Sequence, residues 1–252
     1  MHLASGSRSE GDRGRTLFIS DLHLDESRPA AVAQFERFLT RTAPGADGLY
    51  VLGDLFEYWV GDDGLALPFP ARIAQAIAAT ARAVPVFFMH GNRDFLIAER
   101  FARETAMTLL ADPTIVDLYG ERTLLMHGDT LCTGDAAYQA FRATVREPAW
   151  QSVALARPLD ERIAIAHKMR ADSEAAKGGK AAEIMDVAPE AVDKAFAASG
   201  CRVMIHGHTH RPGRHVHQVL GRECVRWVLG DWYESGTYLE ATSAGIRSID
   251  VA

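Results

Sequence analysis

The sequence predicts an α/β domain, and the order of its apolar patterns carries this prediction. In the first half, short β-rich apolar runs alternate with amphipathic helical patterns, and in the second half a long helical stretch is followed by further β runs. The chain has 252 residues, of which 48% are hydrophobic and 24% charged, as in a globular protein. We expect one large domain over residues 16–252, preceded by a loose tail over residues 1–15.

Three apolar runs in the first half predict strands over residues 16–20, 49–52 and 84–89. The amphipathic stretches 29–41 and 70–82 between them predict helices, which gives a β-α-β-α-β order. Polar residues follow each apolar run. Open α/β sheets bind ligands beyond the carboxyl ends of their strands, so we expect these polar residues to share one rim.

The second half contains a predicted hairpin, in which the runs 116–119 and 122–126 flank Gly120. Residues 134–200 are rich in Ala, Glu, Lys and Arg and predict an insertion that is almost wholly helical. Helices in it should start or break at Pro148, Pro158 and Pro189. Strands are then expected over residues 202–205, 215–220, 225–229 and 237–241.

Composition and charge exclude several classes of protein. A net charge of −6 disfavours general nucleic-acid binding. The longest apolar stretch is about seven residues, so we expect no membrane-spanning helix, and the N-terminus lacks the apolar region of a secretory signal. An odd number of cysteines without C-x-x-C spacing argues against disulfides or a thiolate zinc site and fits a reducing cytoplasm: Cys132, Cys201 and Cys224.

Side chains that can bind metal follow five of the expected strands. They comprise two carboxylates, one amide and four imidazoles: Asp21, His23, Asp54, Asn92, His127, His208 and His210. The pairs Asp21/His23 and His208/His210 are two residues apart, a spacing that points both side chains to one face of an extended chain. A glycine precedes Asp54, Asn92 and His208, where it would let the backbone turn sharply or approach an ion closely.

This mixture of oxygen and nitrogen ligands, without thiolate, suits Mn²⁺, Fe²⁺ or Zn²⁺ better than Ca²⁺ or Mg²⁺. Seven ligands are too many for one tetrahedral zinc, whereas two ions that share a carboxylate would accommodate them and serve hydrolysis at phosphorus. A single Asp or His after a strand is more often a turn or cap residue. Five such clusters at five strand ends favour a metal site.

The ordered set D-x-H, G-D, G-N, H and G-H-x-H resembles that of the calcineurin-like metallophosphoesterases. The segments SDLHL, GDLFEYWVGDD, HGNRDFL, HGDTLCTGD and HGHTHRP narrow the resemblance to the UDP-2,3-diacylglucosamine hydrolases, over essentially the whole chain after residue 15. It implies an α+β sandwich core with a helical lid insertion at about residues 134–200. It also implies two Mn²⁺ ions, bridged by Asp54, one held with Asp21, His23 and His210 and the other with Asn92, His127 and His208.

The same resemblance implies substrate contacts from Asn92, Arg93, Asp135, Ser173, Lys177, Lys180 and His208. Arg93 is the implied catalytic residue, standing where many family members have a general-acid histidine; it is always charged and can grip a phosphate in a fork. A surface salt bridge to Asp94 is the alternative interpretation of Arg93. Lys177 stands where the family usually has Asn, and His206 and His90 are interpreted as structural.

The implied reaction is hydrolysis of UDP-2,3-diacylglucosamine to UMP and 2,3-diacylglucosamine 1-phosphate in lipid A biosynthesis, by attack of water on the α-phosphorus. Between Arg142 and Lys180 the lid has eight basic and five acidic residues, which favours phosphates and an anionic membrane surface. Its apolar residues, such as Trp150 and Leu155, could line an acyl chamber or simply pack the lid onto the core. We expect a peripheral protein on the cytoplasmic face of the bacterial inner membrane, with no nucleic acid and no obligate protein partner.

Two other functions stay open. A metallophosphoesterase that acts on a soluble phosphodiester or nucleotide would have the same ligands but would need no apolar chamber. A non-catalytic scaffold descended from such enzymes would be expected to lack one or more ligands, and none of the family's set is missing from this sequence.

Overall fold

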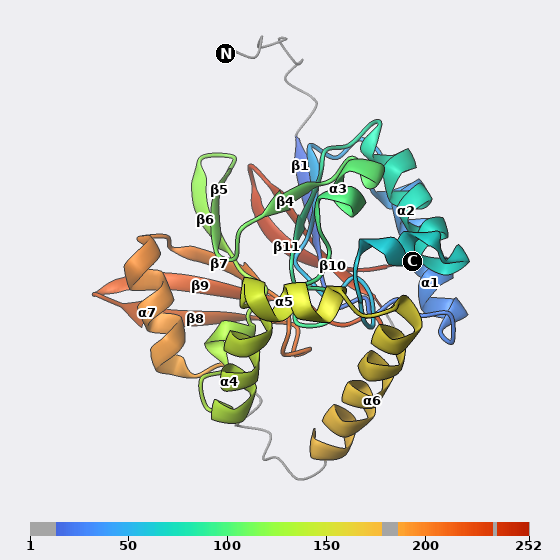
Figure 1. The fold of residues 1–252 in the computed structure, drawn as a ribbon. Coiled ribbons are helices and arrows are strands. Elements are labelled where there is room, and N and C mark those ends of the chain that lie inside the picture. The colour runs from blue at the N-terminus through green and yellow to red at the C-terminus, as the bar shows by residue number, and fades with distance from the viewer. Residues whose placement is uncertain (1–13, 178–185, 234–235, 252) are drawn as a thin grey trace.

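Two β-sheets packed against each other form the centre of the protein (Figure 1). The computed structural model describes residues 14–177, 186–233 and 236–251. The strand order is β11-β10-β1-β2-β3-β4 in the first sheet and β5-β6-β7-β9-β8 in the second. The α/β class and the sandwich arrangement expected from the sequence are confirmed.

The first sheet is built around four parallel strands, β1 to β4, with two antiparallel strands at one side. Its strands are β1 (Arg15–Ile19), β2 (Gly48–Val51), β3 (Val86–Met89), β4 (Thr108–Leu110), β10 (Thr237–Thr242) and β11 (Gly245–Asp250). In the second sheet β6, β7 and β9 are parallel. Its strands are β5 (Thr114–Leu118), β6 (Glu121–Leu125), β7 (Val203–His206), β8 (Gly213–Val219) and β9 (Arg222–Val228).

Helices cover the outer faces of both sheets. The first sheet is covered by α1 (Pro29–Arg37) with a following π-helical turn (Phe38–Thr42), α2 (Pro68–Ala81) and α3 (Glu99–Thr105). The second is covered by α7 (Pro189–Ser199). Short 3₁₀ turns occupy Asp62–Ala66 and Asp129–Leu131. Proline stands in the first turn of α1, α2 and α7, where its missing N–H has no intrahelical partner to lose.

Three further helices lie beyond the ends of the central strands, with α5 (Pro148–Leu155) between the other two (Figure 1). The other two are α4 (Ala136–Val145) and α6 (Leu159–Lys177). All three, with α7, belong to the stretch 134–200 that the sequence predicts as helical, but α7 packs on the second sheet through Val192 and Phe196. Among the described helices of this stretch, α4, α5 and α6 therefore stand where a lid could cover the rim.

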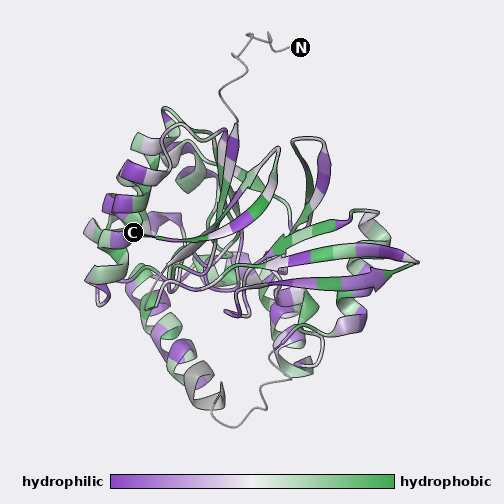
Figure 2. Ribbon diagram, turned by 180° about the vertical axis from the view of Figure 1, so that it is seen from behind, coloured by the Kyte–Doolittle hydropathy of each residue, from purple (hydrophilic) through white to green (hydrophobic). Residues whose placement is uncertain are grey.

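Both faces of the central strands are buried, which explains why their sequences read as unbroken apolar runs. In β1, Leu17 and Ile19 pack under the helices, and Phe18 between them packs into the space between the sheets. Leu125 and Ile205 meet Phe18 there from the second sheet. Figure 2 shows the resulting concentration of hydrophobic residues along the middle strands.

Sequence patterns located most elements to within two or three residues. They missed α3, β4 and β11, which are short or carry mixed polar and apolar residues. β1 begins at Arg15, one residue earlier than expected, because Arg15 pairs with Thr242 of β10. None of the helices in the described parts of the chain is long and apolar enough to cross a bilayer.

Phe88→Ala should lower the free energy of unfolding by roughly 3–5 kcal/mol, because the ring is fully buried in β3 and its removal leaves a cavity. Phe141→Ala is the matched control. That ring on α4 is 41% exposed, so we expect a loss below about 1 kcal/mol. Urea unfolding followed by circular dichroism measures both; equal losses would contradict this description of the core.

Candidate metal centre and substrate cavity

Polar residues that follow β1, β2, β3, β6 and β7 converge on one rim, as the sequence predicts. Asp21, His23 and His210 form a first group. His210 Nε2 lies 3.3 Å from Asp21 Oδ1 and 3.2 Å from His23 Nε2. Two segments 187 residues apart in the chain thus place their side chains in contact.

Asn92, His127 and His208 form a second group. Asn92 Oδ1 lies 3.1 Å from His127 Nε2 and 2.9 Å from His208 Nδ1. Asp54 stands between the two groups, with its Oδ2 3.9 Å from His23 Nε2 and its Oδ1 3.9 Å from His127 Nε2. One oxygen of this carboxylate therefore faces each group, as a bridging ligand requires.

The chemistry of both groups fits divalent cations. In three of the histidines the outward-facing nitrogen lies beside an acceptor: His23 Nδ1 is 3.3 Å from Glu57 Oε2, His127 Nδ1 is 2.8 Å from the Leu52 carbonyl, and His210 Nδ1 is 3.1 Å from Asp231 Oδ2. These contacts assign the ring proton to the outward nitrogen, so the inward nitrogen presents a lone pair. Asn92 Oδ1 likewise faces only acceptors, which are reconciled either by a cation between them or by the amide turned over, with its nitrogen donating to them.

Negative charge dominates the rim. Burial opposes a charge on His127, but the carboxylates around it, Asp54 first, raise its pKa to about 9. Burial also opposes a charge on His210, but the carboxylates of Asp21 and Asp231 beside it raise its pKa to about 10. Burial and the neighbouring charge of His127 lower the pKa of His208 to about 4. A site that holds protons this firmly also attracts metal ions, which displace those protons on binding.

Five of the seven candidate ligand residues adopt left-handed backbone conformations, with φ of 55° at Asp21, 48° at His23, 54° at Asp54, 68° at His208 and 54° at His210. The expectation that the two i, i+2 pairs converge from extended chain is therefore wrong. Left-handed conformations are uncommon outside glycine and cost free energy, and they concentrate at functional sites. Each pair converges because the chain turns sharply at both of its members.

The glycines that precede the ligands provide space for them. A Cβ atom on Gly91 would lie 2.0 Å from Asp54 Oδ1, and one on Gly207 would lie 2.2 Å from Asp21 Oδ2. Gly53 also needs its positive φ of 92°. At Gly91 and Gly207 the backbone lies against a carboxylate of the rim, and the expected close approach to an ion stays a prediction.

Asp94 ties two rim loops together and does not pair with Arg93. It is fully buried, and its two oxygens accept hydrogen bonds from the backbone N–H groups of Gly91 and Leu55, at 2.8 and 2.7 Å. Burial and the charge of Asp54 raise the pKa of Asp94 to about 7. The surface salt bridge considered for Arg93 is thus excluded, since its proposed partner is inside the protein.

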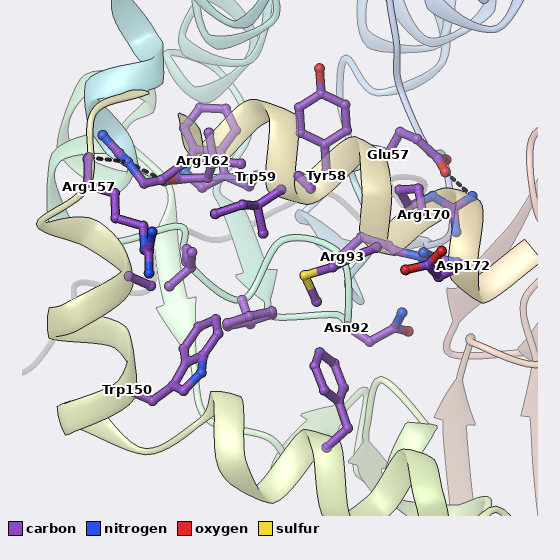
Figure 3. A pocket seen from close by; sticks show the side chains of 18 of the residues that line it. Glu57, Tyr58, Trp59, Asn92, Arg93, Trp150, Arg157, Arg162, Arg170 and Asp172 are labelled. Atoms are coloured by element: carbon purple, nitrogen blue, oxygen red, sulfur yellow. Dashed lines mark hydrogen bonds and ion pairs between the residues drawn. The ribbon is translucent and has the colours of Figure 1, made fainter. Parts of the chain in front are cut away.

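A cavity of about 550 Å³ opens beside the second ligand group (Figure 3). Loop residues from Glu57 to Val60 and from Asn92 to Leu96 form one side, and α4, α5 and α6 form the other. At one end stand the ligand Asn92 and the guanidinium-bearing Arg93 (Figure 3). The rest of the wall is largely apolar and includes Phe141, Trp150, Val153, Ile165 and Met169.

Arg93 has a fixed backbone at the junction of the cavity and the ligand groups. Its N–H donates to Asp54 Oδ1 at 2.8 Å, and its carbonyl accepts from the Trp59 N–H at 2.9 Å. The side chain lines the cavity next to Asn92 (Figure 3). A phosphate placed against Asn92 would therefore meet a permanent positive charge.

The structure also places the remaining residues named in the sequence analysis, which are the expected substrate contacts of the helical stretch and the two histidines interpreted as structural. Asp135 caps α4, where its carboxylate accepts from the Tyr138 N–H at 3.1 Å. Ser173 and Lys177 belong to α6, with side chains beyond those described, and Lys180 lies outside the described residues. Both ring nitrogens of His206 have partners, the Gly207 carbonyl at 2.8 Å and Arg226 at 3.1 Å. His90 Nε2 lies 2.7 Å from the Ile97 carbonyl.

Sequence reasoning missed several residues around the site. Asp231, which faces His210, follows a strand and a glycine and so repeats the pattern that marks Asp54. Asp129 accepts hydrogen bonds from Tyr138 and Arg142 of α4, both at 2.6 Å, and connects that helix to the rim. Glu57 lies in the segment GDLFEYW, but nothing in the sequence pattern indicated that it would contact His23.

Comparison with known proteins places the chain among characterised families. Residues 14–212 match the family model of the calcineurin-like phosphoesterases. Proteins named UDP-2,3-diacylglucosamine hydrolase are similar over nearly the whole length: those of Xanthomonas campestris pv. campestris (strain B100) and Stenotrophomonas maltophilia (strain K279a) are 52% identical, covering 92% and 91% of this chain and 96% of each relative. The protein of that name from Aeromonas hydrophila is 52% identical over 89% of this chain and 93% of its own.

Asp94→Ala should destabilise the protein by roughly 2–5 kcal/mol, because two buried backbone N–H groups lose their acceptor. Asp117→Ala is the matched control, since that carboxylate also accepts from a glycine N–H, at 2.8 Å, but in an exposed turn. We expect the control to cost less than about 1 kcal/mol. Urea unfolding at neutral pH measures both losses, and a stability of Asp94→Ala equal to the parent's would contradict the structural role of Asp94.

Proposed function

The chain belongs to the UDP-2,3-diacylglucosamine hydrolases of the calcineurin-like phosphoesterase family, and from this membership we propose that it hydrolyses UDP-2,3-diacylglucosamine to UMP and 2,3-diacylglucosamine 1-phosphate. Water attacks the α-phosphorus in this reaction, which would serve lipid A biosynthesis. One observation carries the proposal: a single cavity has the candidate ligand Asn92 and Arg93 at one end, and a largely apolar wall, interrupted by Arg157 and Arg162, along the rest. A lipid-linked nucleotide has the same division into charged and apolar parts.

Two Mn²⁺ ions are the proposed cofactors. Asp21, His23 and His210 would hold one and Asn92, His127 and His208 the other, with Asp54 shared, as the two groups around the rim suggest. When bound, such ions lower the pKa of water and offset charge on phosphoryl oxygens. The oxygen and nitrogen donors, without sulfur, support Mn²⁺ but also suit Fe²⁺ or Zn²⁺.

Arg93 is the proposed catalytic residue. Its guanidinium would bind the phosphoryl oxygens on which negative charge increases during attack, in the cavity that α4 to α6 line. Asn92 and His208 would contact the same phosphate. Asp135, Ser173, Lys177 and Lys180 are proposed as further substrate contacts on the strength of the family resemblance.

The helices α4, α5 and α6 are proposed as a lid that binds acyl chains and rests on the membrane. Large hydrophobic side chains are exposed on all three: Phe141, Val153, Leu155, Ile165 and Met169. The excess of basic residues in this part of the sequence supports contact with an anionic surface. We infer a peripheral location on the cytoplasmic face of the inner membrane. A soluble phosphodiester as the main substrate would leave the apolar wall without a purpose.

Metal-stripped protein should release no UMP from detergent-solubilised UDP-2,3-diacylglucosamine, and Mn²⁺ should restore turnover. Asp54→Ala should stay inactive in Mn²⁺, because it removes the carboxylate that faces both ligand groups. Chromatographic quantification of UMP measures this, with bis(p-nitrophenyl) phosphate as the soluble comparison. Mn²⁺-dependent cleavage of the soluble diester without any UMP release would keep the metal centre and overturn the lipid substrate.

Arg93→Ala should lower kcat by about 100- to 1000-fold without loss of bound metal, the range for removing one group that stabilises transition-state charge. Arg93→Lys keeps the positive charge but loses the forked guanidinium, so its kcat should lie between those of the parent and Arg93→Ala. Because the hydrogen bond to Asp54 comes from the backbone, neither change removes it. Steady-state kinetics measure kcat of the parent and both variants, and metal analysis measures their bound metal. An unchanged kcat in Arg93→Ala would exclude a catalytic role.

A further inference from the structure

We propose that Glu57 is a positioning residue that joins the ligand His23 to helix α6, so that metal affinity and the docking of α6 depend on each other. The inference rests on the proposed function, because it takes His23 to bind a divalent cation. It adds a role for two residues, Glu57 and Arg170, that belong to neither ligand group.

Each ring nitrogen of His23 faces a different set of polar groups. Its ring is buried, with Nε2 directed toward His210 and Asp54 at 3.2 and 3.9 Å, and Nδ1 directed toward Glu57 Oε2 at 3.3 Å. A carboxylate behind a ligating histidine fixes the ring's orientation and raises its basicity toward the metal. Glu57 is therefore in the position from which a side chain controls the strength of this ligand.

The second oxygen of Glu57 carries the connection to α6. Glu57 Oε1 forms an ion pair with Arg170, which Figure 3 shows at the same end of the cavity as Asn92 and Arg93. Both side chains are mostly buried, 15% and 17% exposed, so solvent screens this pair less than a surface pair.

Other contacts of His23 come from elsewhere in the protein. Tyr233 stacks on the imidazole with ring centroids 5.3 Å apart, and Arg28 lies 4.0 Å from the Tyr233 ring. Arg28 also donates a hydrogen bond to the His23 carbonyl at 2.8 Å. These groups hold the ring in place but do not belong to α6, whereas Glu57 contacts both His23 and Arg170 of α6.

Arg162 provides a natural comparison. It also fastens α6 to the body of the protein, through Asp63 and the Val60 carbonyl, and it is more deeply buried than Arg170. Figure 3 shows it at the opposite end of the cavity from Asn92. Loss of Arg162 should therefore loosen α6 without altering the group behind His23, whereas loss of Arg170 should do both.

Binding free energies that are coupled are coupled in both directions. If Arg170 strengthens metal binding through Glu57, bound metal must also strengthen the docking of α6. This reciprocity gives the proposal a readout that does not depend on catalysis.

The test is a Mn²⁺ titration of metal-stripped protein by isothermal titration calorimetry. Glu57→Gln should weaken Mn²⁺ binding at one site by about 10- to 100-fold, the usual effect of changing a group behind a ligand. Arg170→Ala should weaken it several-fold, and Arg162→Ala should leave it within twofold of the parent. Hydrogen exchange in Leu159–Lys177 should slow on addition of Mn²⁺ in the parent and in Arg162→Ala but not in Arg170→Ala.

Parent-like affinity in both Glu57→Gln and Arg170→Ala would overturn the proposal. So would an equal loss in Arg162→Ala and Arg170→Ala, since general loosening of α6 would then explain the effect. Should Glu57→Gln not fold by circular dichroism, Arg170→Ala against Arg162→Ala decides the question. Absence of Mn²⁺ binding to the parent protein would instead refute the metal centre of the proposed function, and this link with it.

Discussion

Acceptor atoms face one another across the rim, and the surrounding structure must hold them there against their mutual repulsion. His23 and His210 direct their Nε2 atoms at each other over 3.2 Å, and Asn92 Oδ1 faces only acceptors. Such atoms repel unless a proton or a cation lies between them. The protein holds them in place from behind, through hydrogen bonds to the outward nitrogens, left-handed backbone at the ligands and the buried carboxylate of Asp94.

The two-sheet architecture is what allows this convergence. Asp21, His23, Asp54 and Asn92 follow strands of the first sheet, whereas His127, His208 and His210 follow strands of the second. Neither sheet alone supplies either ligand group. The apolar layer between the sheets, with Phe18, Leu125 and Ile205, therefore sets the distance between ligands as well as the stability of the fold.

Local sequence patterns predicted the central strands and the polar residues that converge on the rim, because apolar runs and the polar residues behind them are adjacent in the chain. What depends on tertiary partners could not be predicted. Asp94 has the same neighbours in the sequence whether it pairs with Arg93 or turns inward, and only folding decides. Similarly, α7 resembles α4 to α6 in composition, and its place on the second sheet follows from contacts of Val192 and Phe196. The link from Glu57 to Arg170 spans 113 residues and leaves no local signal.

Arg93 is compatible with the proposed substrate because the leaving group does not need a proton donor. Many calcineurin-like enzymes have a histidine here, which can protonate a poor leaving group. In the proposed reaction the leaving group is a sugar phosphate, a stable anion that needs no proton at the moment of bond cleavage. A fixed positive charge then serves better than a proton donor, since it stabilises the phosphoryl oxygens throughout the reaction. The acyl chains, bound along the apolar wall, would supply binding energy that holds the phosphate against Asn92 and Arg93.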